Sequence, residues 1–215
     1  MLAFTVLPAP LALAVGTVPA VKTPTPPVND LNPPSNFSAT DGQYNTGIRI
    51  SWDAPPEASY YDLYRGPTTD FSQAKIRAHV RIVRFNDRET TPGVSYYYWI
   101  AARAINRTSD IIGPVQGIRG FAPRFQTEPP RLLVANVGST LSIPVKAEGI
   151  PAISFQWYVG KTMLTDGSGI SGSQTDTLTL SPLTIADQND RYFVRIKNAT
   201  GALNSRFVSV EVIRP

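Results

Sequence analysis

Residues 92–104 read PGVSYYYWIAARA, and this stretch decides the fold of the first half of the chain. A Pro-Gly turn comes first, and the residues that follow it alternate with a period of two. Tyr98, Ile100 and Ala102 fall on one side of this run, whereas Trp99 falls on the other. Successive side chains of a β-strand point to opposite faces of the sheet, so the pattern predicts a strand with one face in a core.

Two shorter runs upstream have the same period. Ile48, Ile50 and Trp52 alternate with polar residues, and Tyr61 and Leu63 follow in a second run. Turn-forming residues separate the runs, which is typical of antiparallel β-proteins. We therefore expect several short strands, with Trp52 in the core.

These residues together resemble a fibronectin type III domain over residues 33–119. The resemblance rests on the opening Pro33-Pro34, Trp52 in the second strand, Tyr61-x-Leu63-x-Arg65 in the third, and Pro92-Gly93-x-x-Tyr96 before the long strand. It implies a β-sandwich in which Tyr96 is the corner tyrosine, with its hydroxyl bonded back to the backbone.

The second half of the chain carries a different set of alternating runs. They are Leu141-x-Ile143-x-Val145, a strand around Trp157, and Tyr192-x-Val194-x-Ile196. These runs resemble an immunoglobulin-like domain over residues 120–215. Across both halves, the residues expected in structural cores are Trp52, Tyr96, Val145, Trp157, Tyr192 and Val194.

Val145 and Val194 stand where the immunoglobulin-like family usually has a cysteine pair, with Trp157 between them. Two valines can fill the same space between the sheets. They forgo a restraint on the unfolded chain that is worth on the order of 3–4 kcal/mol. The resemblance therefore implies a cysteine-free version of the fold, similar to those of bacterial surface proteins and bacteriophage virion proteins.

The composition agrees with an all-β fold of two tandem β-sandwiches. The chain has 215 residues, with 20 prolines, 15 glycines and no cysteine. So many prolines and glycines suit strands separated by turns, and the length suffices for two domains that each bury a core. Without disulfides, the stability of both domains must come from packing.

An extended proline-rich arm is expected over residues 1–32. Six prolines fall between residues 17 and 34, which favours a semi-rigid polyproline conformation. Residues 1–15 are apolar, but no basic residue precedes them and Pro8 and Pro10 interrupt them, so they make a poor signal peptide. The same run is too short and too broken for a membrane span.

The chain carries a net charge of +4, and its arginines are unevenly distributed. One stretch with few acids holds Arg77, Arg81, Arg84, Arg88, Arg103, Arg107, Arg119, Arg124 and Arg131. Such a basic face can meet an anionic partner, although no nucleic acid is expected. The alternative is that the arginines guard exposed strand edges against pairing.

No catalytic, cofactor or metal site is expected. His79 is the only histidine and no cysteine is present, so the residues for a catalytic triad or a thiolate metal site are lacking. No glycine-rich loop precedes a helical pattern, and the carboxylates are scattered. The chain is therefore expected not to be an enzyme.

The candidate ligand-binding residues are aromatic. If Tyr61 and Tyr98 point inward, alternation places Tyr60, Tyr64, Tyr97 and Trp99 on the outer face of two neighbouring strands. Exposed aromatic rings in a row could stack on sugars or anchor a protein partner. The alternative is that the chain's own arm or a neighbouring copy packs over these rings and covers them.

These patterns favour a non-enzymatic structural or adhesion protein. The first hypothesis is a bacteriophage virion component, namely a head decoration, fibre or tail protein on the virion surface. Its arm would contact other virion proteins, and its sandwiches would bind host surface polysaccharides or proteins in many copies. The alternative is a spacer or accessory segment of a larger bacterial cell-surface or secreted protein.

Overall fold

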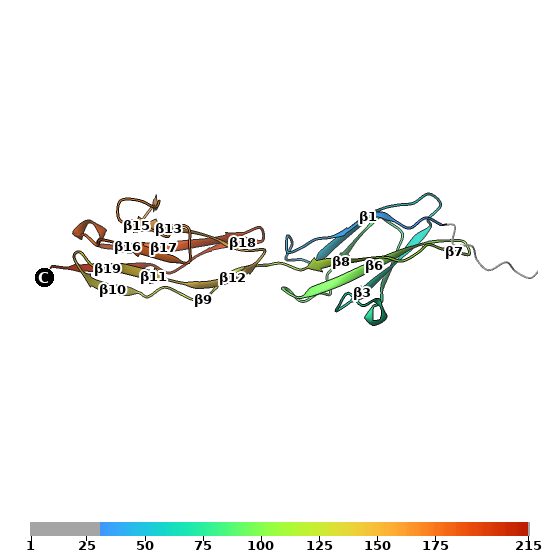
Figure 1. Ribbon diagram of the computed structural model, residues 1–215, viewed down its shortest axis with the longest axis horizontal. Coiled ribbons are helices and arrows are strands. Elements are labelled where there is room, and N and C mark those ends of the chain that lie inside the picture. The colour runs from blue at the N-terminus through green and yellow to red at the C-terminus, as the bar shows by residue number, and fades with distance from the viewer. Residues whose placement is uncertain (1–30, 215) are drawn as a thin grey trace, which may run out of the picture.

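The computed structural model of the protein describes residues 31–214, and the expected arm before residue 31 lies outside them. Figure 1 shows two β-sandwiches arranged end to end, with the C-terminus at the far end of the second. Strands β1–β8 pair only among themselves, as do β9–β19. The prediction of an all-β fold with two tandem sandwiches is confirmed.

The first sandwich packs a three-stranded sheet against a five-stranded sheet. The order is β1-β2-β5 in one sheet and β4-β3-β6 in the other, where β7 and β8 both pair with β6. The strands are β1 (Ser35–Ala39), β2 (Ile48–Asp53), β3 (Tyr60–Gly66), β4 (Lys75–Val80), β5 (Arg84–Asp87), β6 (Ser95–Ala104), β7 (Arg107–Thr108) and β8 (Ile112–Ile118). A short 3-10 turn, η1 (Phe71–Gln73), connects β3 and β4.

Residues from the alternating runs predicted in the sequence fill the first core. Residues of β2 alternate strictly between buried and exposed, and Trp52 lies inside with its ring 5.2 Å from that of Tyr61. Ile100 of β6 is fully buried in the same cluster. Leu31, which the sequence assigned to the arm, is also buried there. The first core therefore reaches back to the first described residue.

The second sandwich uses more and shorter strands. They are β9 (Phe121–Thr127), β10 (Leu132–Asn136), β11 (Leu141–Pro144), β12 (Lys146–Ile150), β13 (Ser154–Val159), β14 (Thr162–Met163), β15 (Ile170–Ser171), β16 (Thr177–Leu180), β17 (Asn189–Asn198), β18 (Gly201–Asn204) and β19 (Val208–Ile213). A 3-10 turn, η2 (Ile185–Asp187), precedes β17.

The chain changes sheets early in this sandwich. Strand β9 pairs antiparallel with β12, and β10 then pairs parallel with β19 at the edge of the sheet β10-β19-β17-β13-β14. Strand β18 adds to β17, and a third sheet has the order β11-β16-β15.

Apolar packing fills the second core. Trp157 and Val194 are fully buried opposite each other on β13 and β17, and Val145 lies in the same cluster. The indole Nε1 of Trp157 donates to the carbonyl of Thr175 at 3.0 Å, which satisfies its buried polar group. The two valines thus occupy an apolar core that no disulfide crosslinks.

The junction between the sandwiches consists of Arg119 and Gly120. Gly120 donates its backbone N–H to the carbonyl of Tyr44, and a Cβ placed on it would lie 2.7 Å from the carbonyl oxygen of Ile150. Arg119 donates to the carbonyls of Asn45 and Thr90. Backbone from both sandwiches therefore meets at Gly120 with no room for a side chain.

Candidate binding surfaces

The predicted aromatic residues do share the outer face of the five-stranded sheet. Tyr64 lies opposite Trp99 in the pairing of β3 with β6, and Tyr97 lies opposite Gly66. The predicted exposure of Trp99 is wrong, because its exposed fraction is 4%. Phe71 packs against it, with ring centroids 5.6 Å apart. No pattern in the sequence indicated that the turn η1 would fold over this face.

The rest of the aromatic face is also largely packed. Tyr64 and Tyr97 are half-buried, and Phe71 stacks edge-on against Tyr64 at 5.2 Å. Tyr60 keeps an exposed fraction of 37% and has the ring of His79 beside it. The outer face is therefore a second packed layer, and ligand binding by these four aromatic residues stays a prediction.

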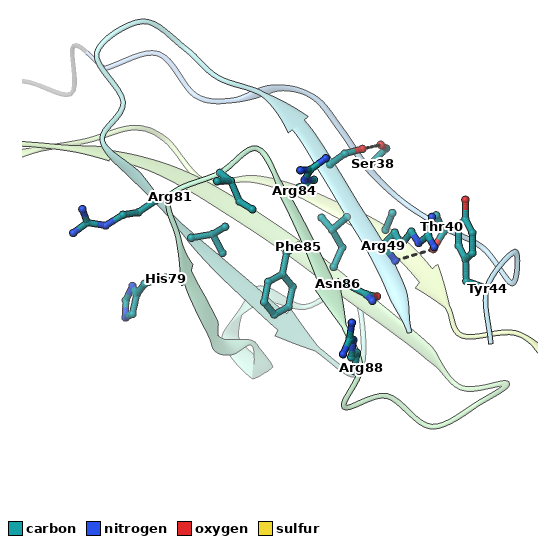
Figure 2. A pocket seen from close by; sticks show the side chains of 15 residues that line it. Ser38, Thr40, Tyr44, Arg49, His79, Arg81, Arg84, Phe85, Asn86 and Arg88 are labelled. Atoms are coloured by element: carbon teal, nitrogen blue, oxygen red, sulfur yellow. Dashed lines mark hydrogen bonds between the residues drawn. The ribbon is translucent and has the colours of Figure 1, made fainter. Parts of the chain in front are cut away.

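A recess of the described residues lies elsewhere, around strand β5. We call it the basic recess, and it encloses about 1010 Å³, at the upper end of the ~300–1,000 Å³ typical of ligand pockets. Its lining residues are Ser38, Ala39, Thr40, Tyr44, Arg49, Ile50, Ser51, His79, Val80, Arg81, Ile82, Arg84, Phe85, Asn86 and Arg88. Figure 2 shows His79 and Arg81 on one side of it and Tyr44 and Arg49 on the other.

The charges of the basic recess are of one sign. Arg49, Arg81, Arg84 and Arg88 line it, and no carboxylate does so among the described residues. None of the four makes an ion pair within residues 31–214. Arg49 lies over the ring of Tyr44, with its guanidinium carbon 3.5 Å from the ring centroid. Unpaired guanidinium groups in one recess favour an anionic partner.

Other arginines of the first sandwich form ion pairs with its buried carboxylates. Arg65 and Arg77 both reach the fully buried Asp87, at 2.8 and 3.0 Å, and the hydroxyl of Tyr98 donates to the same carboxylate at 3.0 Å. Arg103 donates to the buried Asp62. These bonds tie β3, β4, β5 and β6 together, so these arginines are structural.

His79 belongs to the same ionic layer. Its Nδ1 lies 2.6 Å from a carboxylate oxygen of Asp62, while most of its ring is exposed. The sequence showed His79 as the single histidine but could not show its buried acidic partner. His79 therefore joins the wall of the basic recess to the buried charges behind it.

The pKa values of the two buried tyrosines Tyr98 and Tyr192 are raised. Burial, together with the neighbouring charge of Asp87, raises the pKa of Tyr98 well above its usual range. Burial, and then the charge of Asp187, raises the pKa of Tyr192 to about 12. Both hydroxyls thus stay protonated and act as hydrogen-bond donors.

Each sandwich has a tyrosine bonded to the backbone five residues upstream. The hydroxyl of Tyr192 donates to the carbonyl of Asp187 at 2.9 Å. The hydroxyl of Tyr96 instead accepts from the backbone N–H of Thr91 at 3.2 Å, and that bond lowers its pKa. Tyr192 is buried and Tyr96 is half-buried against the first core.

The second sandwich presents an aromatic cluster that the sequence analysis missed. Tyr158 stacks on Phe193 with ring centroids 5.1 Å apart, and Phe207 meets Phe193 edge-on at 5.5 Å. The exposed fraction of Phe207 is 57%. Phe193 sits between Tyr192 and Val194, so the outward position of that alternation was the available signal.

The described residues bring together no group of three potential metal ligands. Within the same part of the chain, no helix has the length and apolarity to cross a membrane.

Comparisons with known proteins support the immunoglobulin-like reading of the second half. Residues 123–212 match the immunoglobulin I-set domain. This match covers the second sandwich, including Trp157 and Val194. No curated protein sequence matches the chain.

Solved structures with tandem domains share the fold. An I-band fragment of titin is 16% identical with a TM-score of 0.57, over 86% of this chain and 67% of the fragment. Extracellular domains 3–5 of Drosophila OTK are 15% identical with a TM-score of 0.50, over 83% of this chain and 61% of that one. At these identities the similarity shows the fold alone.

A third solved structure is similar over a smaller part of the chain. The Fn3-like protein from Clostridium thermocellum is 18% identical over 40% of this chain and 91% of that one, with a TM-score of 0.38. Immunoglobulin-like and fibronectin type III-like domains are typically non-enzymatic structural or binding modules, and the chain has this fold.

Proposed function

We propose that the chain is a surface-displayed adhesion protein that binds its partner through the first sandwich. The observation that carries the proposal is the basic recess, where Arg49, Arg81, Arg84 and Arg88 have no ion pair among the described residues. A folded protein gains little from gathering unpaired like charges, because they repel one another. Binding an anionic partner would relieve that repulsion.

The junction suits display. Only Arg119 and Gly120 separate β8 from β9. Both bond to loops of the first sandwich, and the backbone of Ile150 from the second sandwich packs closely against Gly120. A short, bonded connection favours a stiff rod over two tethered domains. Such a rod would hold the first sandwich at a fixed distance from whatever contacts the other end.

The setting we propose is the surface of a bacteriophage particle, as a head decoration, fibre or tail component. The cysteine-free second core supports a chain whose stability does not depend on oxidative folding. Many copies on a particle would raise the effective affinity of a weak site for host surface glycans or proteins. The alternative setting is a spacer in a larger bacterial cell-surface or secreted protein.

The test is localisation with antibodies raised against the folded protein. Immunogold labelling of the producing culture should decorate virus-like particles in the first setting and the cell envelope in the second. Antibody absorbed with purified protein is the control and should label neither. Label confined to the cytoplasm would contradict display in both settings.

A further inference from the structure

We propose that the basic recess receives an extended acidic peptide segment of a partner protein, which adds as a strand to the free edge of β5. The proposal deepens the adhesion role proposed above and rests on it. It names the partner by its chemistry: a segment in which acidic and apolar residues alternate.

Strand β5 has a free edge that faces the recess. It pairs with β2 alone, and β4 pairs with β3 alone, so no backbone pairing closes the seam between β4 and β5. The ion pair of Arg77 with Asp87 bridges this seam at the Asp87 end of β5. The backbone N–H of Trp52 donates to the carbonyl of Val83, just before β5. Antiparallel strands alternate in bonding direction, so the backbone groups of Arg84 and Asn86 point to the open edge.

A strand added at this edge would meet two different surfaces. On the outer face of the sheet, Arg84 lies opposite Ser51, and Asn86 lies opposite Arg49. On the inner side, Phe85 lies opposite Ile50. Side chains of the added strand alternate between these faces, so one set would meet arginines and the other an apolar floor.

The apolar floor distinguishes a peptide from a polysaccharide. Val80 is buried, Phe85 is half-buried, and Ile82 at the rim has an exposed fraction of 59%. An anionic polysaccharide satisfies the arginines but has no apolar side chains for the floor. An extended peptide of alternating character satisfies the arginines, the floor and the free backbone groups together.

Charge complementarity selects an acidic segment from outside this chain. The recess holds four arginines and no carboxylate among the described residues. The chain's own residues 1–30 contain one acidic residue, Asp30, and one basic residue, Lys22. That segment does not match four positive charges, so the occupant we infer belongs to a partner.

Isothermal titration of the 215-residue chain with a synthetic octapeptide of alternating glutamate and valine tests the proposal. We expect binding that weakens as salt rises, and a loss of about tenfold in affinity for Arg84→Glu or Arg88→Glu. The matched control is Arg131→Glu, an exposed arginine of the second sandwich, which should leave the affinity unchanged. Circular dichroism should show that all variants keep their fold.

Three further probes separate strand addition from simple charge attraction. The same peptide with N-methyl groups on alternate residues loses the N–H groups of one edge, and we expect it not to bind. An alternating lysine and valine peptide should not bind either. Equal affinity for the N-methylated peptide, or tighter binding of alginate than of the glutamate peptide, would overturn the proposal.

Failure of the peptide site and failure of the proposed display role would give different results. A protein that fails to bind the peptide yet labels particles or envelopes keeps its display role and loses this site. Concentration-dependent self-association in sedimentation that Arg84→Glu abolishes would assign the recess to a second copy of this chain, and would also overturn the proposal.

Discussion

The two sandwiches share a fold class and are stabilised differently. The first buries two carboxylates, Asp62 and Asp87, and surrounds them with arginines and a tyrosine. The second buries no charged residue among those described, and packs Trp157 and Val194 in an apolar core. A buried ion pair adds little over an apolar core but is costly to break, so the first sandwich depends on a few residues and the second on many.

This difference separates structural arginines from functional ones. Arg65, Arg77 and Arg103 have buried acidic partners, whereas Arg84 and Arg88 point into the basic recess without one among the described residues. A basic stretch in the sequence does not distinguish the two groups. Only the three-dimensional pairing shows which charges are available to a partner.

The largest expected effect is on the buried carboxylate of the first sandwich. Asp87→Asn leaves Arg65 and Arg77 without their buried counter-charge and should destabilise the first sandwich by about 3–5 kcal/mol. Differential scanning calorimetry should show one transition shifted and the other unchanged. The control Glu89→Gln removes the exposed partner of Arg77 and should cost less than about 1 kcal/mol.

A second prediction uses alkaline pH. The pKa of Tyr192 is raised from 10.0 to about 12, so the protonated form is favoured in the folded state. The stability that this provides is complete below pH 10 and is lost as the pH rises to about 12, a decrease of about 2–3 kcal/mol. Urea unfolding at stepwise higher pH should show it.

The matched variant for the alkaline experiment is Tyr192→Phe, which removes the ionisable hydroxyl of the second sandwich. It should unfold more easily at neutral pH, because the bond to Asp187 is lost, but its stability should fall less above pH 10. The first sandwich should still weaken in both proteins, since the pKa of Tyr98 is raised as well. If the stability of the second sandwich fell equally above pH 10 in both proteins, the loss would not come from the hydroxyl of Tyr192.

The third prediction concerns the apolar core of the second sandwich. Val194→Ala removes two methyl groups from a fully buried position and should destabilise that sandwich by about 2 kcal/mol. Calorimetry should show the second transition lowered while the first keeps its position. A shift of both transitions together would mean that the two sandwiches unfold as one unit.

The last prediction concerns the junction, where the effect on the packing of the two cores is expected to be smallest. Gly120→Val touches no residue of either core cluster, so its cost should fall on the junction itself. A Cβ at Gly120 would lie 2.0 Å from the carbonyl oxygen of Gly42, so the junction must open. Small-angle X-ray scattering should show a changed radius of gyration. Gly138→Ala should not change it, because no atom lies within 4 Å of its Cβ and the strain from its φ of +82° stays within its own turn.

Alternation predicted much of the fold from the sequence. It assigned Trp52 and Tyr98 to the first core and Trp157 and Val194 to the second, because a period of two maps directly onto the two faces of a strand. It also put Tyr64 and Trp99 correctly on one face. The local pattern is enough to predict which side chains of a strand are buried when burial depends only on which face they occupy.

The binding surfaces were harder to predict. Phe71 covers Trp99 from a turn whose path depends on tertiary contacts. The basic recess combines side chains of β1, β2, β4 and β5, and it exists only because β4 and β5 do not pair. The cluster of arginines was visible in the sequence, but which of them lacked acidic partners was not.

Amide hydrogen exchange is the most direct test of the central claim that β5 offers a free edge to an acidic strand. In the protein alone, the amides of Arg84 and Asn86 should exchange rapidly, whereas that of Phe85, bonded to β2, should be protected. Adding the glutamate and valine octapeptide should slow exchange at Arg84 and Asn86. Unchanged exchange at these two amides under saturating peptide would contradict the account.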